Sequence, residues 1–139
     1  QGCGKGMKKV CLDTDFLVSL LRKKQEANDR AREYEEKGVI ISTTSMNAFE
    51  IFFGAYRSLE AIKNLKEADD LLDSLNILHL TKDSAKKSSE ILSKLIKEGK
   101  PIELRDAIIA GIALTEDYTL VTRNIIHFER ITGLSLEKW

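Results

Sequence analysis

Val10-Cys11-Leu12-Asp13-Thr14-Asp15-Phe16-Leu17-Val18 is an apolar run that meets acidic residues and passes directly into an amphipathic pattern. The apolar residues predict a short buried strand, which places the carboxylate of Asp13 at the strand's carboxyl end. A helix is expected to start there, with Thr14 or Asp15 capping its free N–H groups. Open parallel α/β sheets bind ligands at the carboxyl ends of their strands. An acidic residue later in the chain is therefore a candidate site residue only if its side chain can reach Asp13.

Short apolar runs alternate with longer amphipathic segments along the rest of the chain. Further strands are predicted at residues 39–41, 77–80 and 119–122, with a short edge strand within 128–139. Helices are predicted at residues 16–21, 25–37, 46–53, 59–75, 82–98 and 104–115. This alternation predicts an α/β fold with a twisted, mostly parallel central sheet that helices cover on both faces. No internal repeat or linker is visible, so one domain spanning residues 7–139 is expected.

The composition gives no global signal for a charged partner. Among 139 residues, Lys and Arg number 22 and Asp and Glu number 22, so the formal net charge is zero and nucleic-acid binding would need a local patch. Cys3 and Cys11 show neither a C-x-x-C spacing nor a zinc pattern. Because no signal peptide or membrane-spanning run is visible, we expect a cytoplasmic protein. Residues 1–6, which precede Met7, are interpreted as a cloning remnant outside the fold.

Three acidic residues stand where solubility does not explain them. Asp13 ends the first strand, Glu50 interrupts a helix that is otherwise expected to serve the core, and Asp106 falls in the first turn of a helix rich in Ala and Gly. Burying unpaired carboxylates is costly, and clustering them adds mutual repulsion. A divalent cation relieves both penalties, and ligands that are all oxygen favour Mg²⁺ or Mn²⁺.

Each of these acids also has a purely structural interpretation. Asp13 can cap the helix that follows it. Glu50 can extend into solvent from the edge of its helix, and Asp106 near a helix start is favoured by the helix dipole whatever its function. Only the three acids together indicate a site.

Four segments, taken together, resemble the motifs of PIN-domain nucleases, and of VapC-type toxins in particular. In order they are Leu12-Asp13-Thr14-Asp15-Phe16-Leu17, Ser45-Met46-Asn47-Ala48-Phe49-Glu50-Ile51 followed by Gly54-Ala55, Arg105-Asp106-Ala107-Ile108-Ile109-Ala110, and Leu120-Val121-Thr122-Arg123-Asn124 followed by Phe128. The resemblance runs from about residue 8 to residue 139, which is nearly the whole chain.

The resemblance implies a PIN-like three-layer α/β/α domain that acts as a metal-dependent endoribonuclease on single-stranded RNA, as the toxin of a type II toxin–antitoxin pair. It implies that Asp13, Glu50 and Asp106 are the catalytic and metal-binding acids, with Mg²⁺ or Mn²⁺ as cofactor. It also places the hydroxyl groups of Thr14 and Thr122 near the site. A small antitoxin and a second copy of the chain, in a homodimer, are the implied partners.

The chain departs from the family's motifs at two places. Asp15 stands where the family usually has Asn, and this extra acid can bind metal or only cap a helix. Where many members have a fourth acid, this chain has Asn124 and His127. A neutral amide can orient water or a phosphate, but it holds a second metal less firmly. His127 is interpreted as a surface or capping residue, because imidazole is an unusual ligand of Mg²⁺.

Two further predictions concern how RNA and a partner would be held. The cations near the motifs, Lys100, Arg105 and Arg123, either hold RNA phosphates or are ordinary solvated cations. The resemblance implies an inhibitory partner that lays an apolar helix into a groove between helices 16–21 and 49–53 and sends an Arg or Lys toward the three acids, which need a counter-charge.

Alternative functions remain open from the sequence. The same motifs fit a PIN nuclease that serves RNA maturation, or a PIN-fold RNA-binding module that is catalytically weak. Asp13-Thr14-Asp15 also fits the Asp-x-Asp opening of haloacid-dehalogenase-type phosphatases, although Leu17 and the lack of a later Asp pair count against this. RNA cleavage that depends on Asp13 would indicate the nuclease, whereas a covalent phosphate on Asp13 would indicate the phosphatase.

Overall fold

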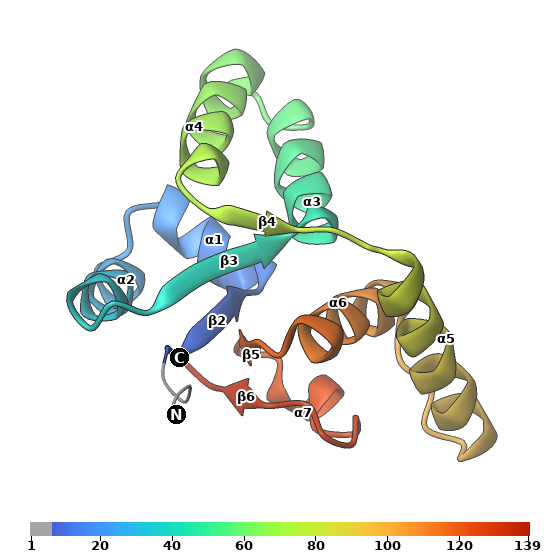
Figure 1. Ribbon diagram of the computed structural model, residues 1–139. Helices are drawn as coiled ribbons and strands as arrows, with labels where there is room; N and C mark the ends of the chain where they lie inside the picture. Colours follow the sequence, from blue (N-terminus) through green and yellow to red (C-terminus); the bar gives the residue numbers. More distant parts are fainter. Residues whose placement is uncertain (1–6) are drawn as a thin grey trace.

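A five-stranded, wholly parallel sheet forms the middle layer of the molecule in the computed structural model, which describes residues 7–139 (Figure 1). Its strands are, in spatial order, β4 (Asn76–Leu78), β3 (Ile40–Thr44), β2 (Lys9–Leu12), β5 (Thr119–Val121) and β6 (Leu136–Glu137). The predicted parallel sheet is confirmed, and the strand near the end of the chain lies at the edge as expected. Cys3 and the expected cloning remnant lie outside the described residues.

Helices cover both faces of this sheet (Figure 1). One face carries α1 (Thr14–Leu21), α2 (Gln25–Glu36), α3 (Ser45–Tyr56) and α4 (Ala61–Asp73). The other face carries α5 (Lys82–Lys97), α6 (Leu104–Glu116) and α7 (Ile125–Phe128). Successive strand residues alternate between the two cores: Val10 and Leu12 pack toward the first group of helices, and Cys11 packs toward the second. The predicted α/β/α layering is therefore confirmed.

The order of the strands determines where a ligand can bind. From the central β2 the chain moves outward through β3 to β4 at one edge, and then returns to β5 on the other side of β2. This reversal between β2 and β5 creates a crevice at their carboxyl ends, which is where parallel α/β sheets bind ligands.

Two boundaries near this crevice differ from the prediction. The N-cap of α1 is Asp13, whose carboxylate accepts a hydrogen bond from the backbone N–H of Thr14 at 2.8 Å, so the capping residue is neither Thr14 nor Asp15. The strand predicted at 39–41 starts at Ile40 and continues to Thr44, because β3 hydrogen-bonds with β4 as well as with β2. Thr44 then caps α3.

The helices α5 and α6 pack closely because α6 has no side chain at Gly111. A Cβ atom at this position would lie 1.9 Å from Ser88 Oγ and 2.8 Å from the Ser88 backbone nitrogen. The ends of α5 follow the sequence signals, with Thr81 as its N-cap and Gly99 at φ +72° just beyond it. The Ala- and Gly-rich composition of this helix therefore serves its close contact with α5.

The expectation that residues 46–53 form a helix devoted to the core is wrong. Only one side of α3 is buried, at Ile51 and Ala55 and at the polar Asn47. Phe49 is 63% exposed and Phe53 is 53% exposed, with their rings stacked on each other 6.0 Å apart. The aromatic content of this helix therefore exceeds what its contacts with α1 and α4 need.

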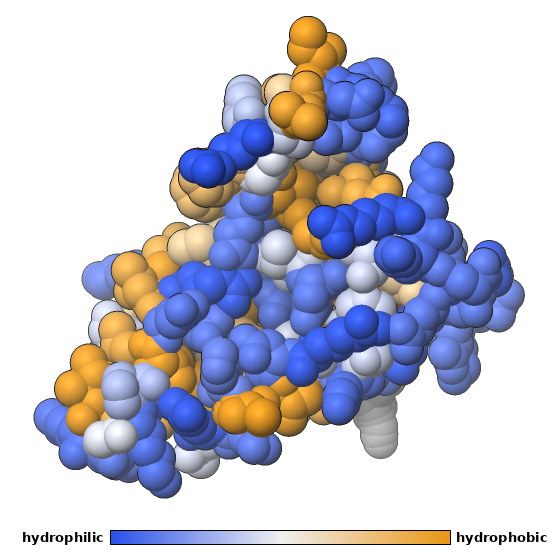
Figure 2. Space-filling view, turned by 180° about the vertical axis from the view of Figure 1, so that it is seen from behind, coloured by the Kyte–Doolittle hydropathy of each residue, from blue (hydrophilic) through white to orange (hydrophobic). Residues whose placement is uncertain are grey.

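Hydrophobic side chains also gather at the far end of the α3–α4 pair. Figure 2, which shows the molecule from behind, has them at the top, over the connection between these two helices. Tyr56, Leu59 and Ile62 are exposed there, at 69%, 105% and 89%.

The C-terminal segment packs into the core between the sheet and helices α1 to α4. Trp139 is 7% exposed and its ring lies 4.7 Å from the ring of Phe16. The short helix α7, which the sequence pattern does not predict, buries Phe128 in the second core. Across residues 7–139, the structure has no helix with the length and apolar character needed to cross a membrane.

Candidate active site

The strands β2 and β5 end side by side, and each is followed by a buried polar residue. Asp13 follows β2 and Thr122 follows β5. The backbone N–H of Asp13 donates to the carbonyl oxygen of Val121 at 3.0 Å, and Thr122 Oγ1 donates to Asp13 Oδ2 at 2.7 Å. The central carboxylate is thus fixed by the sheet itself.

Asn47 fixes the second oxygen of this carboxylate from the neighbouring helix. Its Nδ2 donates to Asp13 Oδ1 at 3.0 Å and to Thr14 Oγ1 at 2.8 Å, and the side chain is fully buried. Its Oδ1 accepts from the Thr44 hydroxyl at 2.6 Å, while Thr44 Oγ1 accepts from the Asn47 backbone N–H at 3.1 Å. One amide therefore caps α3 and orients the acid.

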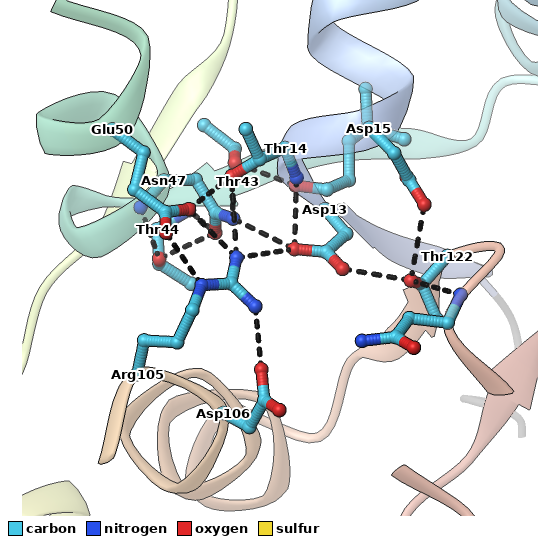
Figure 3. Close-up of polar contacts among 12 residues, drawn as sticks. Asp13, Thr14, Asp15, Thr43, Thr44, Asn47, Glu50, Arg105, Asp106 and Thr122 are labelled. Atoms are coloured by element: carbon cyan, nitrogen blue, oxygen red, sulfur yellow. Dashed lines mark hydrogen bonds and ion pairs between the residues drawn. The ribbon is translucent and has the colours of Figure 1, made fainter. Parts of the chain in front are cut away.

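The side chain of Arg105 lies between the three predicted acids (Figure 3). Its Nε and Nη2 donate to the two oxygens of Glu50 at 2.6 and 2.7 Å, and Nη2 also donates to Asp13 Oδ1 at 3.1 Å. Its Nη1 donates to Asp106 Oδ1 at 2.5 Å. The structure therefore brings together carboxylates from the end of β2, from α3 and from the first turn of α6, as the sequence predicts. Thr14 adds a hydrogen bond to Glu50 Oε1.

These contacts and the burial of the cluster shift the pKa values of Arg105 and Asp106. Desolvation works to lower the pKa of Arg105, but the hydrogen bonds and charges of Glu50 and Asp13 outweigh it and raise that pKa. Burial raises the pKa of Asp106 above its ordinary value, even though Arg105 opposes the rise. Asp106 is 1% exposed, which makes it the acid of the cluster that most needs a cation beside it.

Asn124 and His127 lie beside Asp106, at the position where the motifs lead one to expect a fourth acid. His127 Nδ1 is 3.8 Å from Asp106 Oδ2 and 2.8 Å from Asn124 Nδ2. The side chain of His127 is 49% exposed. These two residues border the cluster from α7, and they add no further carboxylate to it.

Asp15 and Arg123 bind the C-terminal residue near the site. Asp15 Oδ2 accepts from the Arg123 backbone N–H at 2.9 Å, and Oδ1 accepts from Trp139 Nε1 at 3.2 Å. Burial raises the pKa of Asp15, although the bond from Arg123 opposes the rise. The Arg123 guanidinium stacks 3.7 Å from the Trp139 ring centre and pairs with Glu26. Asp15 thus holds the C-terminal residue, and it shares the Thr122 hydroxyl with Asp13, at 3.5 Å from its own Oδ2.

The three predicted phosphate-binding cations are not equivalent in the structure. Arg105 is held inside the acid cluster, and Arg123 lies at the side of the site against Trp139. Lys100 is exposed in the connection between α5 and α6, outside this hydrogen-bond network. Their contact with RNA stays a prediction.

The donor set fits a hard divalent cation in kind. Asp13, Glu50 and Asp106 offer carboxylate oxygens from three elements, and they already share one cationic group. Within residues 7–139, however, no three or more His, Cys, Asp or Glu side chains are arranged to hold an ion. The guanidinium of Arg105 stands between the carboxylates that would have to converge.

Two residues have roles in the site that sequence reasoning missed. Asn47 belongs to the second motif without an expected role, although Thr44 and Asn47 have the spacing of a capping box, which signals a side chain turned back onto the helix start. Arg105 is expected at RNA phosphates, and no local pattern indicates that its side chain turns toward Glu50, which is 55 positions away in the sequence.

A model of a known protein family matches most of the chain. The model of the PIN domain matches residues 10–134. The chain belongs to the PIN domain family. Among curated proteins, it is 29% identical to the tRNA(fMet)-specific endonuclease VapC of Salmonella typhimurium and 30% identical to Ribonuclease VapC2 of Haemophilus influenzae, strain Rd. Each match covers 96% of this chain and 99% of the relative.

Solved structures agree with this assignment to the PIN family. VapBC2 from Rickettsia felis, bound to a DNA fragment from its promoter, matches with a TM-score of 0.87 at 26% identity, covering 94% of this chain and 98% of that chain. DNA-bound VapBC from Salmonella typhimurium matches with a TM-score of 0.86 at 27% identity, covering 96% and 99%. The predicted resemblance to PIN domains and VapC proteins is confirmed.

Proposed function

We propose that this PIN domain, residues 7–139, is a metal-dependent endoribonuclease of the VapC type that cleaves single-stranded RNA and serves as the toxin of a toxin–antitoxin pair. The observation that carries the proposal is the grouping of Asp13, Glu50 and Asp106 around Arg105, at the switch point between β2 and β5. The names of its relatives, an endonuclease specific for tRNA(fMet) and a ribonuclease, support RNA as the substrate class.

In this function the three acids hold a divalent cation, Mg²⁺ or Mn²⁺. When bound, the cation would supply Lewis acidity to the phosphodiester and to the attacking water. The chain's own residues fix the geometry: Thr122 and Asn47 each hold one oxygen of Asp13, and Thr14 holds Glu50. Because water attacks the phosphorus, no protein nucleophile is needed.

RNA phosphates would be bound at the rim of the site. Arg123 and Lys100 lie near the motifs in the sequence. His127 on α7 stands beside Asp106, and Asn124 at the N-cap of α7 contacts His127. With no net charge on the chain, affinity for RNA depends on these few groups and not on a long-range field.

The antitoxin would bind in a groove of about 290 Å³ between α1, α3 and α4. The groove has apolar and polar walls and includes Glu50, so a bound helix can present a cation to the acids. Its apolar walls are formed by Val18, Leu21, Ile51, Gly54, Ala55 and Ala68. The sequence predicted α1 and α3 as walls and missed α4. The similarity of the chain to the VapBC2 structure from Rickettsia felis supports a partner of this kind.

We also propose a homodimer, because Phe53 and Tyr56 remain exposed on α3 beside the apolar end of the α3–α4 pair. Light scattering of the isolated protein at tens of micromolar would measure its mass.

Cleavage of a single-stranded RNA by the purified protein, with and without Mg²⁺ or Mn²⁺, tests the activity. We expect cleavage only with the cation, and a loss of at least about 100-fold in Asp13→Asn because the central acid is removed. Asp29→Asn is the matched control, since Asp29 is an exposed acid on α2, and it should cleave as the wild type does. Equal cleavage by Asp13→Asn and the wild type would refute the assignment.

The toxin role needs a separate measurement. Expression of the chain alone should arrest growth, and co-expression of the product of the neighbouring gene should relieve the arrest. Cleavage in vitro without growth arrest would favour a nuclease that serves RNA maturation.

A further inference from the structure

We propose that Arg105 is a built-in counter-ion of the acid cluster, which a divalent cation must displace before it can bind. This inference rests on the proposed metal-dependent function and adds a competitor that belongs to the chain itself. In the metal-free protein the guanidinium holds the three carboxylates together, and on binding the cation takes over that role.

Arg105 supplies the positive charge that faces the three acids of the cluster. Among residues 7–139, it is the one Lys or Arg side chain that forms an ion pair with Asp13, Glu50 or Asp106. Its planar fork contacts all three acids at once, with the two-point contact on Glu50 that a guanidinium favours. A single positive group thereby relieves the repulsion among three carboxylates.

The guanidinium and a metal ion cannot occupy this cluster together. Mg²⁺ binds its oxygen ligands at about 2.0–2.1 Å, so its ligands must surround one point. In the structure no three acidic side chains surround a common point, because the carboxylates are spread around the guanidinium: Glu50 accepts from Nε and Nη2, Asp13 from Nη2, and Asp106 from Nη1. The carboxylates can converge on an ion only if the guanidinium leaves the space between them.

Arg105 and Glu50 are also placed so that this exchange is feasible. The Arg105 side chain is 23% exposed and that of Glu50 is 27% exposed, whereas those of Asp13 and Asp106 are 4% and 1% exposed. The cluster therefore opens to solvent on the side of Arg105 and Glu50. The long arginine side chain can swing outward there while Asp13 and Asp106 stay in place.

Calorimetric titration with Mn²⁺ tests the competition in the wild type, Arg105→Gln and Arg32→Gln. Arg32→Gln is the matched control, since it removes the same charge from an exposed pair on α2. We expect Arg105→Gln to bind Mn²⁺ at least ten-fold more tightly than the wild type, because no internal cation competes. The control should stay within two-fold of the wild type.

Thermal stability gives a second readout. Without metal, Arg105→Gln should melt below the wild type, because its carboxylates repel one another. Saturating Mn²⁺ should raise its melting temperature by more than it raises that of the wild type. Arg105→Lys keeps the charge without the planar fork, so its Mn²⁺ affinity should fall between the two, and it serves as the second variant if Arg105→Gln does not fold.

Hydrogen exchange of the Arg105 side-chain Nε–H in NMR follows the displacement directly. Titration with Mg²⁺ should make this exchange faster as the bond to Glu50 is lost. Unchanged exchange in a protein that binds Mg²⁺, or equal Mn²⁺ affinity in the wild type and Arg105→Gln, would overturn the inference and leave the proposed function intact. If neither the wild type nor any variant binds these ions, the proposed function itself fails.

Discussion

Asn47 shows how one buried amide can connect the stability of the fold to the geometry of the site. Its carbonyl oxygen accepts from Thr44 at the start of α3, and its amide nitrogen donates to Asp13 and Thr14. A buried polar group costs free energy unless it is paired, and all of these contacts are short. Replacing Asn47 therefore has two separate consequences.

Asn47→Ala should lower the free energy of unfolding by about 2–3 kcal/mol, since it removes the reciprocal half of the capping box of α3 and one buried hydrogen-bond partner each of Asp13 and Thr44. The wild type and variant would be compared by urea denaturation without metal. Asn64→Ala, which removes a half-buried amide that donates to Ser58 from α4, is the control and should cost about 1 kcal/mol. Equal losses in the two variants would show that Asn47 has no special role.

The sequence predicted that three acids lie together, but it did not predict the cation among them. The position of Asp13 could be predicted because it follows the end of a strand. The position of Asp106 could be predicted because it lies at the start of a helix. Arg105 adjoins Asp106 in the sequence, yet its partners Asp13 and Glu50 come from other elements. A long side chain can point in many directions, so which group it reaches depends on how the elements pack.

The contact between α5 and α6 depends on the absence of a side chain at Gly111. Gly111→Ala would place a Cβ atom 1.9 Å from Ser88 Oγ and 2.8 Å from backbone of the same residue. The hydroxyl can rotate away but the backbone cannot, so the helices must move apart. We expect a loss of about 1–3 kcal/mol in the free energy of unfolding.

Gly54→Ala provides the matched control for Gly111→Ala in thermal melting. Gly54 also lies inside a helix, but a Cβ atom there meets nothing within 4 Å. Alanine should therefore stabilise α3 by up to about 1 kcal/mol through its higher helix propensity. If both alanine variants are more stable than the wild type, the close approach at Gly111 is not needed.

The edge strand β6 is held by the carboxylate of Glu137. This residue pairs with Lys8 and Arg30 at 2.7 Å each and accepts a hydrogen bond from Tyr34. Partial burial raises the pKa of Glu137, but the bonds from Lys8 and Tyr34 outweigh it, so the net shift is downward. An acid with a lowered pKa stabilises the fold above its ordinary pKa, and that stability is lost as the pH falls through its folded value.

Glu137→Gln should therefore reduce stability by about 1 kcal/mol at pH 7, and this difference should shrink as the pH falls below about 4. Melting temperatures of the wild type and Glu137→Gln between pH 3 and 7 would measure it. Glu33→Gln is a suitable control, because Glu33 lies on the exposed side of α2 and, among residues 7–139, its one ion pair is with Lys37 next to its own helix. A difference that grows toward acid pH would contradict the assigned direction.

The overall architecture was more predictable than the assignment of its helix faces. Alternation of strands and helices is a property of the whole chain, so the parallel α/β/α arrangement followed from it. The burial of α3 did not follow, because its aromatic residues at positions 49, 52, 53 and 56 have the spacing of one helix face, yet packing buries the side that carries Ile51 and Ala55.

Gly54 offers a direct test of the groove between α1, α3 and α4. It lines the groove, and a Cβ atom placed there meets no atom within 4 Å, so Gly54→Leu should extend its side chain into the groove without a backbone clash. Pull-down of the neighbouring gene's product should lose at least ten-fold in affinity, while RNA cleavage and Mn²⁺ binding by the isolated protein stay near the wild-type values. Gly54→Ala, which fills little of the space, should still bind the partner.

Phe52 is a poorer test position because its ring packs against the core, so Phe52→Asp would also cost stability. If Gly54→Leu binds the partner as the wild type does, the inhibitory helix must lie on another face of the molecule.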